Sequence, residues 1–191
     1  MTTNVPPTTE ATTPRWRGIN HLALVTTDMD ATVRFYHGAL GARLVATVGN
    51  PAFRHYFFEL GPQCTIAFFE YADSTAEPFA KPAGVADPRA TQFDHVAFNL
   101  PDEDALHDLR QRLKSADCEV TDVVDHGGVR SVYFTDPNGI ALEASWWVLD
   151  ATGRSADYGD SRFFGDANPV PAFRELQATG ELTSVPSTRV A

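Results

Sequence analysis

Apolar and polar residues follow the same order of patterns twice along this chain. In each of two stretches, alternating apolar positions predict four strands, at 18–26, 43–48, 54–60 and 65–71, and again at 93–100, 119–124, 129–135 and 140–147. After the first strand of each set, apolar residues have a helical spacing. It predicts one helix that begins after Asp28 and a second helix over 102–115. Each stretch is therefore predicted to fold as βαβββ. Because one such sheet cannot cover its own apolar face, we expect an α+β fold in which the two modules pair into one curved sheet.

The repeat also predicts how the chain is divided. Module one spans 16–75 and module two spans 93–148, and together they are expected to form a single domain over 16–148, with a polar, Pro-rich connector between them. Residues 1–15 are rich in Thr and Pro and nearly lack large apolar side chains, so we expect them to be disordered. The extension 149–191 lies outside the repeat, and a short helix is expected there near 172–177.

Composition narrows the classes of partner. The formal net charge of the 191 residues is −10, and no run of Lys and Arg is present, which argues against nucleic acid as a partner. No apolar run approaches the roughly 20 residues of a membrane-spanning helix, and the N-terminus lacks the pattern of a signal peptide. Cys64 and Cys118 have no metal-ligand spacing, which favours a reduced, cytoplasmic setting. A small-molecule substrate is the expected partner.

Both modules begin with a histidine and end with a glutamate. His21 precedes Glu70 by 49 residues, and His95 precedes Glu143 by 48 residues. A metal site on a pseudo-twofold axis requires imidazole and carboxylate groups at matching places in two copies, and both groups are common ligands of divalent metals. The spacing therefore favours a metal-dependent function.

The stretches that carry these residues resemble a known family. They include Asn20–Val25, the Phe35-Tyr36 helix that ends at Leu40-Gly41, Phe93–Ala97, and Tyr133–Gly139 leading into Leu142-Glu143. In this order they resemble the vicinal oxygen chelate superfamily, which contains glyoxalases, bleomycin-resistance proteins and extradiol dioxygenases. The resemblance implies a cup around one divalent metal ion held by His21, His95 and Glu143, in a homodimer. Such a triad favours Fe(II), and Mn, Co, Ni or Zn would also fit.

Glu70 bears on the choice of reaction. As a fourth ligand it would give the His/Glu/His/Glu site of glyoxalase I-like isomerases, which leaves two open positions on an octahedral metal. Ring opening of a catechol needs three open positions on the metal, two for the diol and one for dioxygen. Because side chains alternate along a strand, a one-residue slip between the modules would turn Glu70 outward and put Phe69 in the cup. The sequence leaves both arrangements open.

Three further residues are candidates for catalysis. Tyr133 lies ten residues before Glu143, a spacing that resembles the active-site tyrosine of extradiol dioxygenases. His126 lies in a segment that resembles a motif of catechol dioxygenase-like members, and His55 lies two residues from Phe57, which aligns roughly with Tyr133. Imidazole can serve as acid or base near neutral pH.

The favoured function is therefore an extradiol-type dioxygenase that acts on an aromatic diol. A glyoxalase I-like isomerase, or a related lyase or epimerase, is the first alternative. A non-catalytic binding protein that sequesters a drug is the second.

Overall fold

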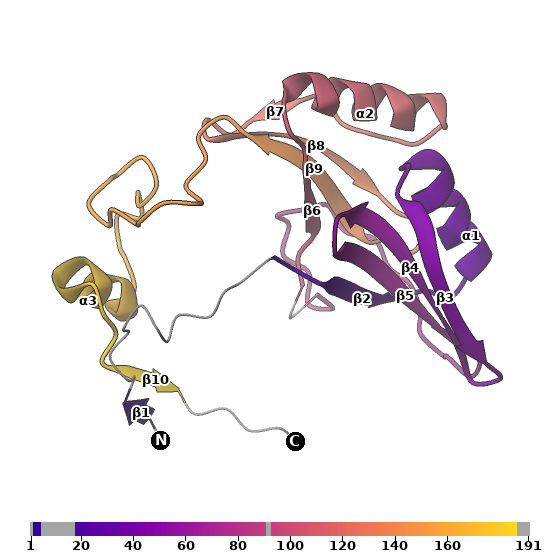
Figure 1. Ribbon diagram of the computed structural model, residues 1–191, viewed down its shortest axis with the longest axis horizontal. Helices are drawn as coiled ribbons and strands as arrows, with labels where there is room; N and C mark the ends of the chain where they lie inside the picture. Colours follow the sequence, from indigo (N-terminus) through magenta and orange to yellow (C-terminus); the bar gives the residue numbers. More distant parts are fainter. Residues whose placement is uncertain (1, 5–17, 91–92, 187–191) are drawn as a thin grey trace. The chain divides into compact units, whose positions relative to one another are not determined.

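The protein is described here by a computed structural model that covers residues 2–4, 18–90 and 93–186. The chain divides into two compact units. One unit, Arg17–Asp150, contains both modules, and the other combines the two ends of the chain, Met1–Trp16 and Ala151–Ala191. Figure 1 labels the helices and strands.

Module one has the predicted βαβββ order. Its elements are strand β2 (His21–Val25), helix α1 (Met29–Val33) with its π-helical continuation η2 (Arg34–Ala39), and strands β3 (Arg43–Asn50), β4 (Phe53–Gly61) and β5 (Cys64–Tyr71). Asp28 caps α1 because its carboxylate accepts a hydrogen bond from the Ala31 N–H at 2.9 Å. The strands lie in the order β2-β5-β4-β3, with β2 parallel to β5. We call this sheet one.

Module two repeats this topology. Its elements are β6 (Val96–Asn99), α2 (Glu103–Ser115), β7 (Val124–Asp125), β8 (Val129–Thr135) and β9 (Ala141–Trp147), and its strands lie in the order β6-β9-β8-β7, which we call sheet two. Strand β7 is much shorter than the strand predicted over 119–124. The Thr121 side chain, rather than a backbone carbonyl, accepts the Tyr133 N–H at 3.0 Å, so regular pairing does not extend through this segment.

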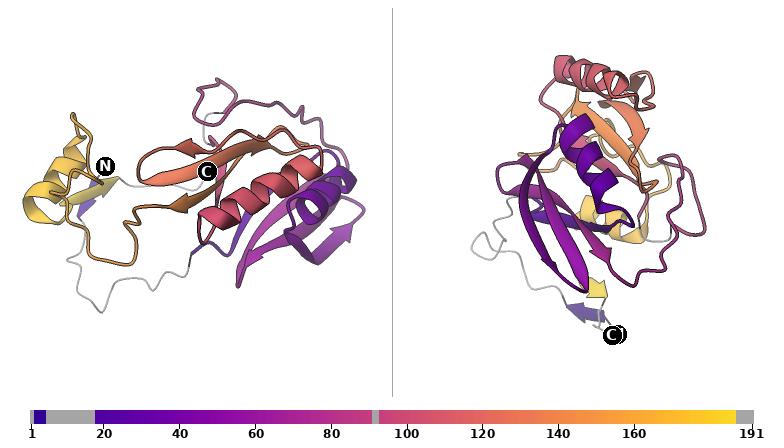
Figure 2. Two further views of the ribbon diagram at one scale, coloured as in Figure 1. Left: turned by 90° about the horizontal axis from the view of Figure 1, so that it is seen from above. Right: turned by 90° about the vertical axis from the view of Figure 1, so that its right-hand side faces the viewer.

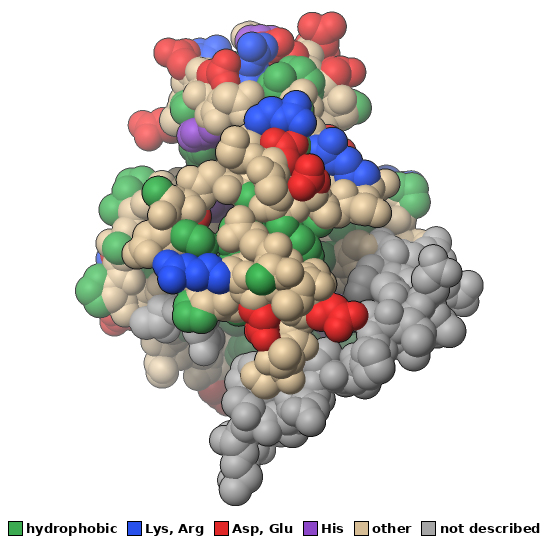
Figure 3. All heavy atoms as spheres, turned by 90° about the vertical axis from the view of Figure 1, so that its left-hand side faces the viewer, with side chains coloured by type: hydrophobic (Ala, Val, Ile, Leu, Met, Phe, Trp, Pro, Cys, Tyr) green, Lys and Arg blue, Asp and Glu red, His purple; other side chains and the backbone are tan. Residues whose placement is uncertain are grey.

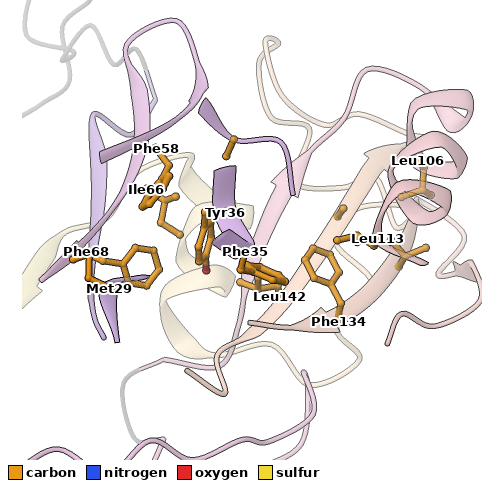
Figure 4. Close-up of a cluster of buried hydrophobic side chains, with 13 residues drawn as sticks. Met29, Phe35, Tyr36, Phe58, Ile66, Phe68, Leu106, Leu113, Phe134 and Leu142 are labelled. Carbon is orange, nitrogen blue, oxygen red and sulfur yellow. The ribbon is translucent and has the colours of Figure 1, made fainter. Parts of the chain in front are cut away.

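The helix-covered faces of both sheets share one hydrophobic core. Phe35 and Tyr36 of η2 lie between the two sheets (Figure 4). The Tyr36 ring contacts Phe68 of sheet one at 4.8 Å between centroids, and the Phe35 ring lies 6.5 Å from Phe134 of sheet two. Helices α1 and α2 lie side by side (Figure 2), and Arg112 donates a hydrogen bond to the Ala39 carbonyl at 2.7 Å. The modules are therefore joined through their helices.

This packing changes one expectation. Sheet one and sheet two remain separate four-stranded sheets, whereas a single curved sheet was expected within the chain. Each module covers its apolar face with a helix, and the two helix layers then bury one another. A buried polar network also joins the modules: Tyr36 donates to Asp136 at 3.1 Å, and Thr26 donates to Asn138 at 2.6 Å.

The unit built from the chain ends contains helix α3 (Pro171–Thr179), which confirms the short helix predicted there. Strand β1 (Thr2–Asn4) pairs antiparallel with β10 (Ser184–Pro186). Paired backbone at Thr2–Asn4 corrects the expectation of disorder for these residues, and 5–15 lie outside the described residues.

Within the described part of the chain, no helix combines the length and apolar character needed to cross a bilayer. On the face drawn in Figure 3, acidic and basic side chains are interspersed, and no extended basic surface is visible among the described residues.

Candidate metal centre

Sheet two brings His95 and Glu143 into contact. His95 comes just before β6. Glu143 lies in the neighbouring strand β9 and pairs with Ala97 of β6, so the side chains of His95 and Glu143 both point away from the shared core. The His95 Nε2 atom lies 2.9 Å from Glu143 Oε2. Glu143 is only 7% exposed, and its other oxygen accepts a hydrogen bond from the Ser131 hydroxyl. This buried carboxylate is therefore held in place beside an imidazole nitrogen.

Sheet one carries His21 on the corresponding face. Leu24 of β2 packs against the core and Leu22 is half-buried, so the alternation of side chains turns His21 to the other side of the sheet. There its ring lies 5.8 Å from Phe57 and 6.4 Å from His55, between centroids. His21 is exposed, unlike the buried Glu143.

The two imidazoles are oriented in the same way. His21 Nδ1 lies 2.8 Å from Asn20 Oδ1, and His95 Nδ1 lies 2.6 Å from Asp94 Oδ1. The residue before each histidine therefore occupies Nδ1 and leaves Nε2 as the atom able to ligate a metal. Metal-ligating histidines ordinarily have such a partner on the second nitrogen. The donor set thus fits a divalent metal ion.

The three predicted ligands do not meet within one chain. Across residues 2–4, 18–90 and 93–186, no three His, Cys, Asp or Glu side chains are grouped closely enough to hold a metal ion. The reason is the shared core: His21 and the pair His95 and Glu143 lie on the outer faces of two different sheets.

Glu70 lies on the opposite face of sheet one from His21, which corrects the hypothesis that it shares the site. Its carboxylate accepts a hydrogen bond from the Met29 N–H at 3.0 Å, at the start of α1, and forms an ion pair with Arg54. Phe69 instead faces the same side as His21, as expected for a one-residue slip. The strand pairing places Ala67 opposite Ala23 in module one, just as Glu143 lies opposite Ala97 in module two. Module one therefore has alanine where module two has its carboxylate.

Tyr133 and His126 lie together near Glu143. Tyr133 is paired with Glu143 across β8 and β9, and its hydroxyl lies 2.8 Å from His126 Nε2. Burial, together with the nearby Glu143 charge, raises the pKa of Tyr133 above its ordinary value of 10.0, so the phenol stays protonated at neutral pH. A hollow of about 660 Å³ lies between Tyr133 and connector residues 80–83.

His55 lies on the His21 side of sheet one. Its ring stacks on Phe69 with 3.6 Å between centroids, and its Nε2 is buried without a hydrogen-bond partner among the described residues. Burial, followed by the charge of His21, lowers the pKa of His55 below its ordinary 6.5, which favours the neutral imidazole. Phe57 and Tyr133 occupy equivalent positions in the two modules, opposite Ala67 and Glu143 respectively.

Three residues of the site escaped the sequence analysis. Ser131 could have been found, because it lies two residues before Tyr133 and so faces the same side. Asp94 could have been found as the neighbour of His95. Lys81, which contacts Asp94, lies in the connector, where no periodicity marks it.

Comparison with known proteins decides the family. The sequence profile of the Glyoxalase/Bleomycin resistance protein/Dioxygenase superfamily matches residues 18–144. The chain belongs to this superfamily. The resemblance inferred from the sequence motifs is thereby confirmed, and the matched region corresponds to the two modules described above.

Two relatives share moderate similarity with this chain. The glutathione transferase FosA of Serratia marcescens is 28% identical over 127 residues, which cover 66% of this chain and 79% of FosA. The uncharacterised protein YaeR of Escherichia coli K12 is 30% identical over 129 residues, which cover 65% of this chain and 92% of YaeR.

Solved structures show the same fold. A superfamily domain from Frankia sp. EAN1pec has a TM-score of 0.59 at 22% identity and covers 69% of this chain and 98% of that domain. Lactoylglutathione lyase from Agrobacterium tumefaciens has a TM-score of 0.51 at 20% identity, covering 70% of this chain and 96% of the lyase. The predicted α+β fold with two tandem modules is confirmed.

Proposed function

We propose that this protein is a metal-dependent enzyme in which His21, His95 and Glu143 hold one divalent ion, with His21 supplied by a second copy of the chain. His95 and Glu143 are already in contact, and His21 lies on the matching face of the other sheet. In a twofold-symmetric dimer, sheet one of each copy would face sheet two of its partner. Such a dimer would contain two equal sites and would complete the cup that one chain leaves open.

The proposed reaction rests on the position of Ala67. It lies where a fourth protein ligand would come from module one, and Glu70 is engaged with Arg54 and the start of α1. Two imidazoles and one carboxylate would leave three positions of an octahedron open. Three open positions suit a substrate that chelates through two oxygens and a dioxygen molecule. We therefore favour an extradiol-type dioxygenase that acts on an aromatic diol.

The residues around the triad support this substrate class. On sheet one, His55, Phe57 and Phe69 form an aromatic surface beside His21 that suits a planar ring. On sheet two, the protonated hydroxyl of Tyr133 can donate a hydrogen bond to a substrate oxygen. His55 and His126 are the bases available to take up the second hydroxyl proton of a diol.

The reaction is balanced without a further reductant. Both atoms of dioxygen enter the product, and one carbon–carbon bond of the ring breaks. A bound divalent ion would supply Lewis acidity toward the two adjacent substrate oxygens. The protein would orient the ring, hold one proton at Tyr133 and accept another at a histidine.

A second candidate is glutathione transfer to a small substrate. The similarity to FosA, a glutathione transferase, favours it. The three open positions proposed for this chain would also admit a chelating substrate. An isomerase with four protein ligands has less support, since the fourth ligand would have to come from Glu70. The second candidate predicts consumption of a thiol and no need for oxygen.

Elemental analysis of anaerobically purified protein, followed by a catechol screen with and without oxygen, tests the function. The dioxygenase predicts bound iron, oxygen uptake equal to ring-cleaved product, and the same metal content in Glu70→Ala. Thiol consumption without oxygen uptake would replace it with the transferase. Absence of stoichiometric metal, even after reconstitution, would overturn both and leave a binding protein.

A further inference from the structure

We infer that Lys81, in the connector between the modules, is a positioning residue for His95 and acts through Asp94. The inference rests on the proposed metal centre. If so, the two modules contribute unequally to metal binding. His95 and Glu143, the half-site of module two, are held more firmly than His21, the half-site of module one, and bind the metal more tightly.

Lys81 is placed for this role by burial and by its contacts. The residue is only 9% exposed, although lysine is almost never buried without a partner. Its ammonium group donates to Asp94 Oδ2 at 2.8 Å and to the Pro82 carbonyl at 3.2 Å. The carboxylate of Asp94 is thus held by a buried cation on one oxygen.

The other oxygen of Asp94 faces His95. Asp94 Oδ1 lies 2.6 Å from His95 Nδ1 and accepts the Gly84 N–H at 2.7 Å. The connector therefore holds Asp94 from two directions, through Lys81 and through the Gly84 backbone. With both oxygens engaged, the carboxylate cannot rotate without losing a contact, and the ring of His95 keeps its Nε2 toward Glu143.

The connector is itself fixed in place. A Cβ at Gly139 would lie 2.3 Å from the Phe79 carbonyl oxygen, which shows how closely the connector backbone approaches the turn after β8. The Arg89 guanidinium lies 4.2 Å above the Phe79 ring. Lys81, two residues beyond Phe79, is therefore anchored to sheet two and not carried by a loose linker.

Module one provides an internal comparison. Asn20 takes the place of Asp94 there, and its neutral amide is the partner of His21. Within the described residues, no Lys or Arg side chain donates a hydrogen bond to Asn20. A carboxylate partner raises the basicity of a metal-ligating imidazole and fixes its orientation better than a neutral amide does. His95 therefore has the stronger support of the two histidines.

Metal affinity tests the inference directly, with Co(II) or Zn(II) alone as the probe and a competing chelator as the readout. Asp94→Asn, which copies the arrangement of Asn20, should weaken binding about 10–100-fold, and Lys81→Met should weaken it about tenfold. If Lys81 acts through Asp94, the double variant should bind no more weakly than Asp94→Asn alone. Additive losses would overturn the inference.

A matched control distinguishes loss of protein stability from loss of His95 positioning. Lys114→Met removes the one other lysine, which is exposed on α2, and should leave affinity unchanged. Lys81→Arg keeps a cation and should recover most of the affinity lost in Lys81→Met. If Lys81→Met does not fold, Lys81→Gln replaces it. A lower melting temperature with unchanged metal affinity would mean that Lys81 is merely structural and would overturn the inference.

These outcomes are distinct from failure of the proposed function. Wild-type protein that binds neither metal would remove the metal centre itself. Wild-type protein that binds metal while Lys81→Met and Asp94→Asn bind it equally well would remove only the role of Lys81.

Discussion

The separation of His21 from His95 leads to a prediction about pairs of defective chains. His21→Ala removes the ligand on sheet one, and His95→Ala removes a ligand on sheet two. If each site combines His21 of one copy with His95 and Glu143 of the other, each variant alone should lose metal binding. A mixed dimer, however, contains one site in which both damaged positions coincide and one site in which every ligand is intact.

The expected recovery follows from counting sites. Random association of equal amounts of the two variants yields mixed dimers as about half of the population, and each mixed dimer keeps one of its two sites, so about a quarter of wild-type metal binding should return. A site built within a single chain predicts no recovery, because every chain then carries a damaged site of its own.

Co-expression of the two variants with different tags, followed by tandem purification, isolates the mixed dimer. Its metal content should be about half that of the wild type, since one of its two sites is intact. Co-expression of His95→Ala with Glu143→Ala is the matched control, because both changes lie in module two and no combination restores a site. Recovery in the control pair, or none in the His21 and His95 pair, would refute the reasoning.

Four further predictions concern the fold and Glu70. Tyr36→Phe leaves a buried oxygen of Asp136 short of a donor and should lower the free energy of unfolding in urea by about 1–3 kcal/mol. Burial raises the pKa of Asp136 above 3.8, so the contribution of Asp136 to folding stability is present at low pH and is lost as pH rises through the raised pKa. The difference in the free energy of unfolding between wild type and Asp136→Asn should therefore shrink as pH rises from about 4 toward neutrality. A constant difference would contradict this prediction. Gly139→Ala, at φ +81°, should cost at least about 1–3 kcal/mol in thermal unfolding. Glu70→Gln should leave metal content unchanged while costing about 1 kcal/mol or less in stability, and loss of metal would restore Glu70 as a ligand.

Much of the fold could be predicted because it depends on local patterns. Alternation located seven of the eight strands in the modules, and the caps at Asp28 and Asp102 marked where their helices begin. The strand predicted over 119–124 was wrong for most of its length, because a side chain of Thr121 competes with the backbone for the Tyr133 N–H. Periodicity alone does not reveal such competition.

The site was less predictable, because it depends on register and on long-range contacts. The contact between His95 and Glu143 follows from the repeat, since His95 directly precedes β6 and Glu143 lies in the neighbouring strand β9. The side on which Glu70 lies depends on the pairing of β5 with β2, and a shift of one residue inverts it. The contact of Lys81 with Asp94 depends on how the connector packs, which no spacing in the sequence records.

The sequence by itself determined the two modules, their strands and helices, and the chemical types available for a metal site, because each follows from residues near one another in the chain. The tertiary structure alone decided that η2 and α2 would bury both sheets in one core. That packing turns His21 and His95 to separate outer faces, so a single chain presents two half-sites.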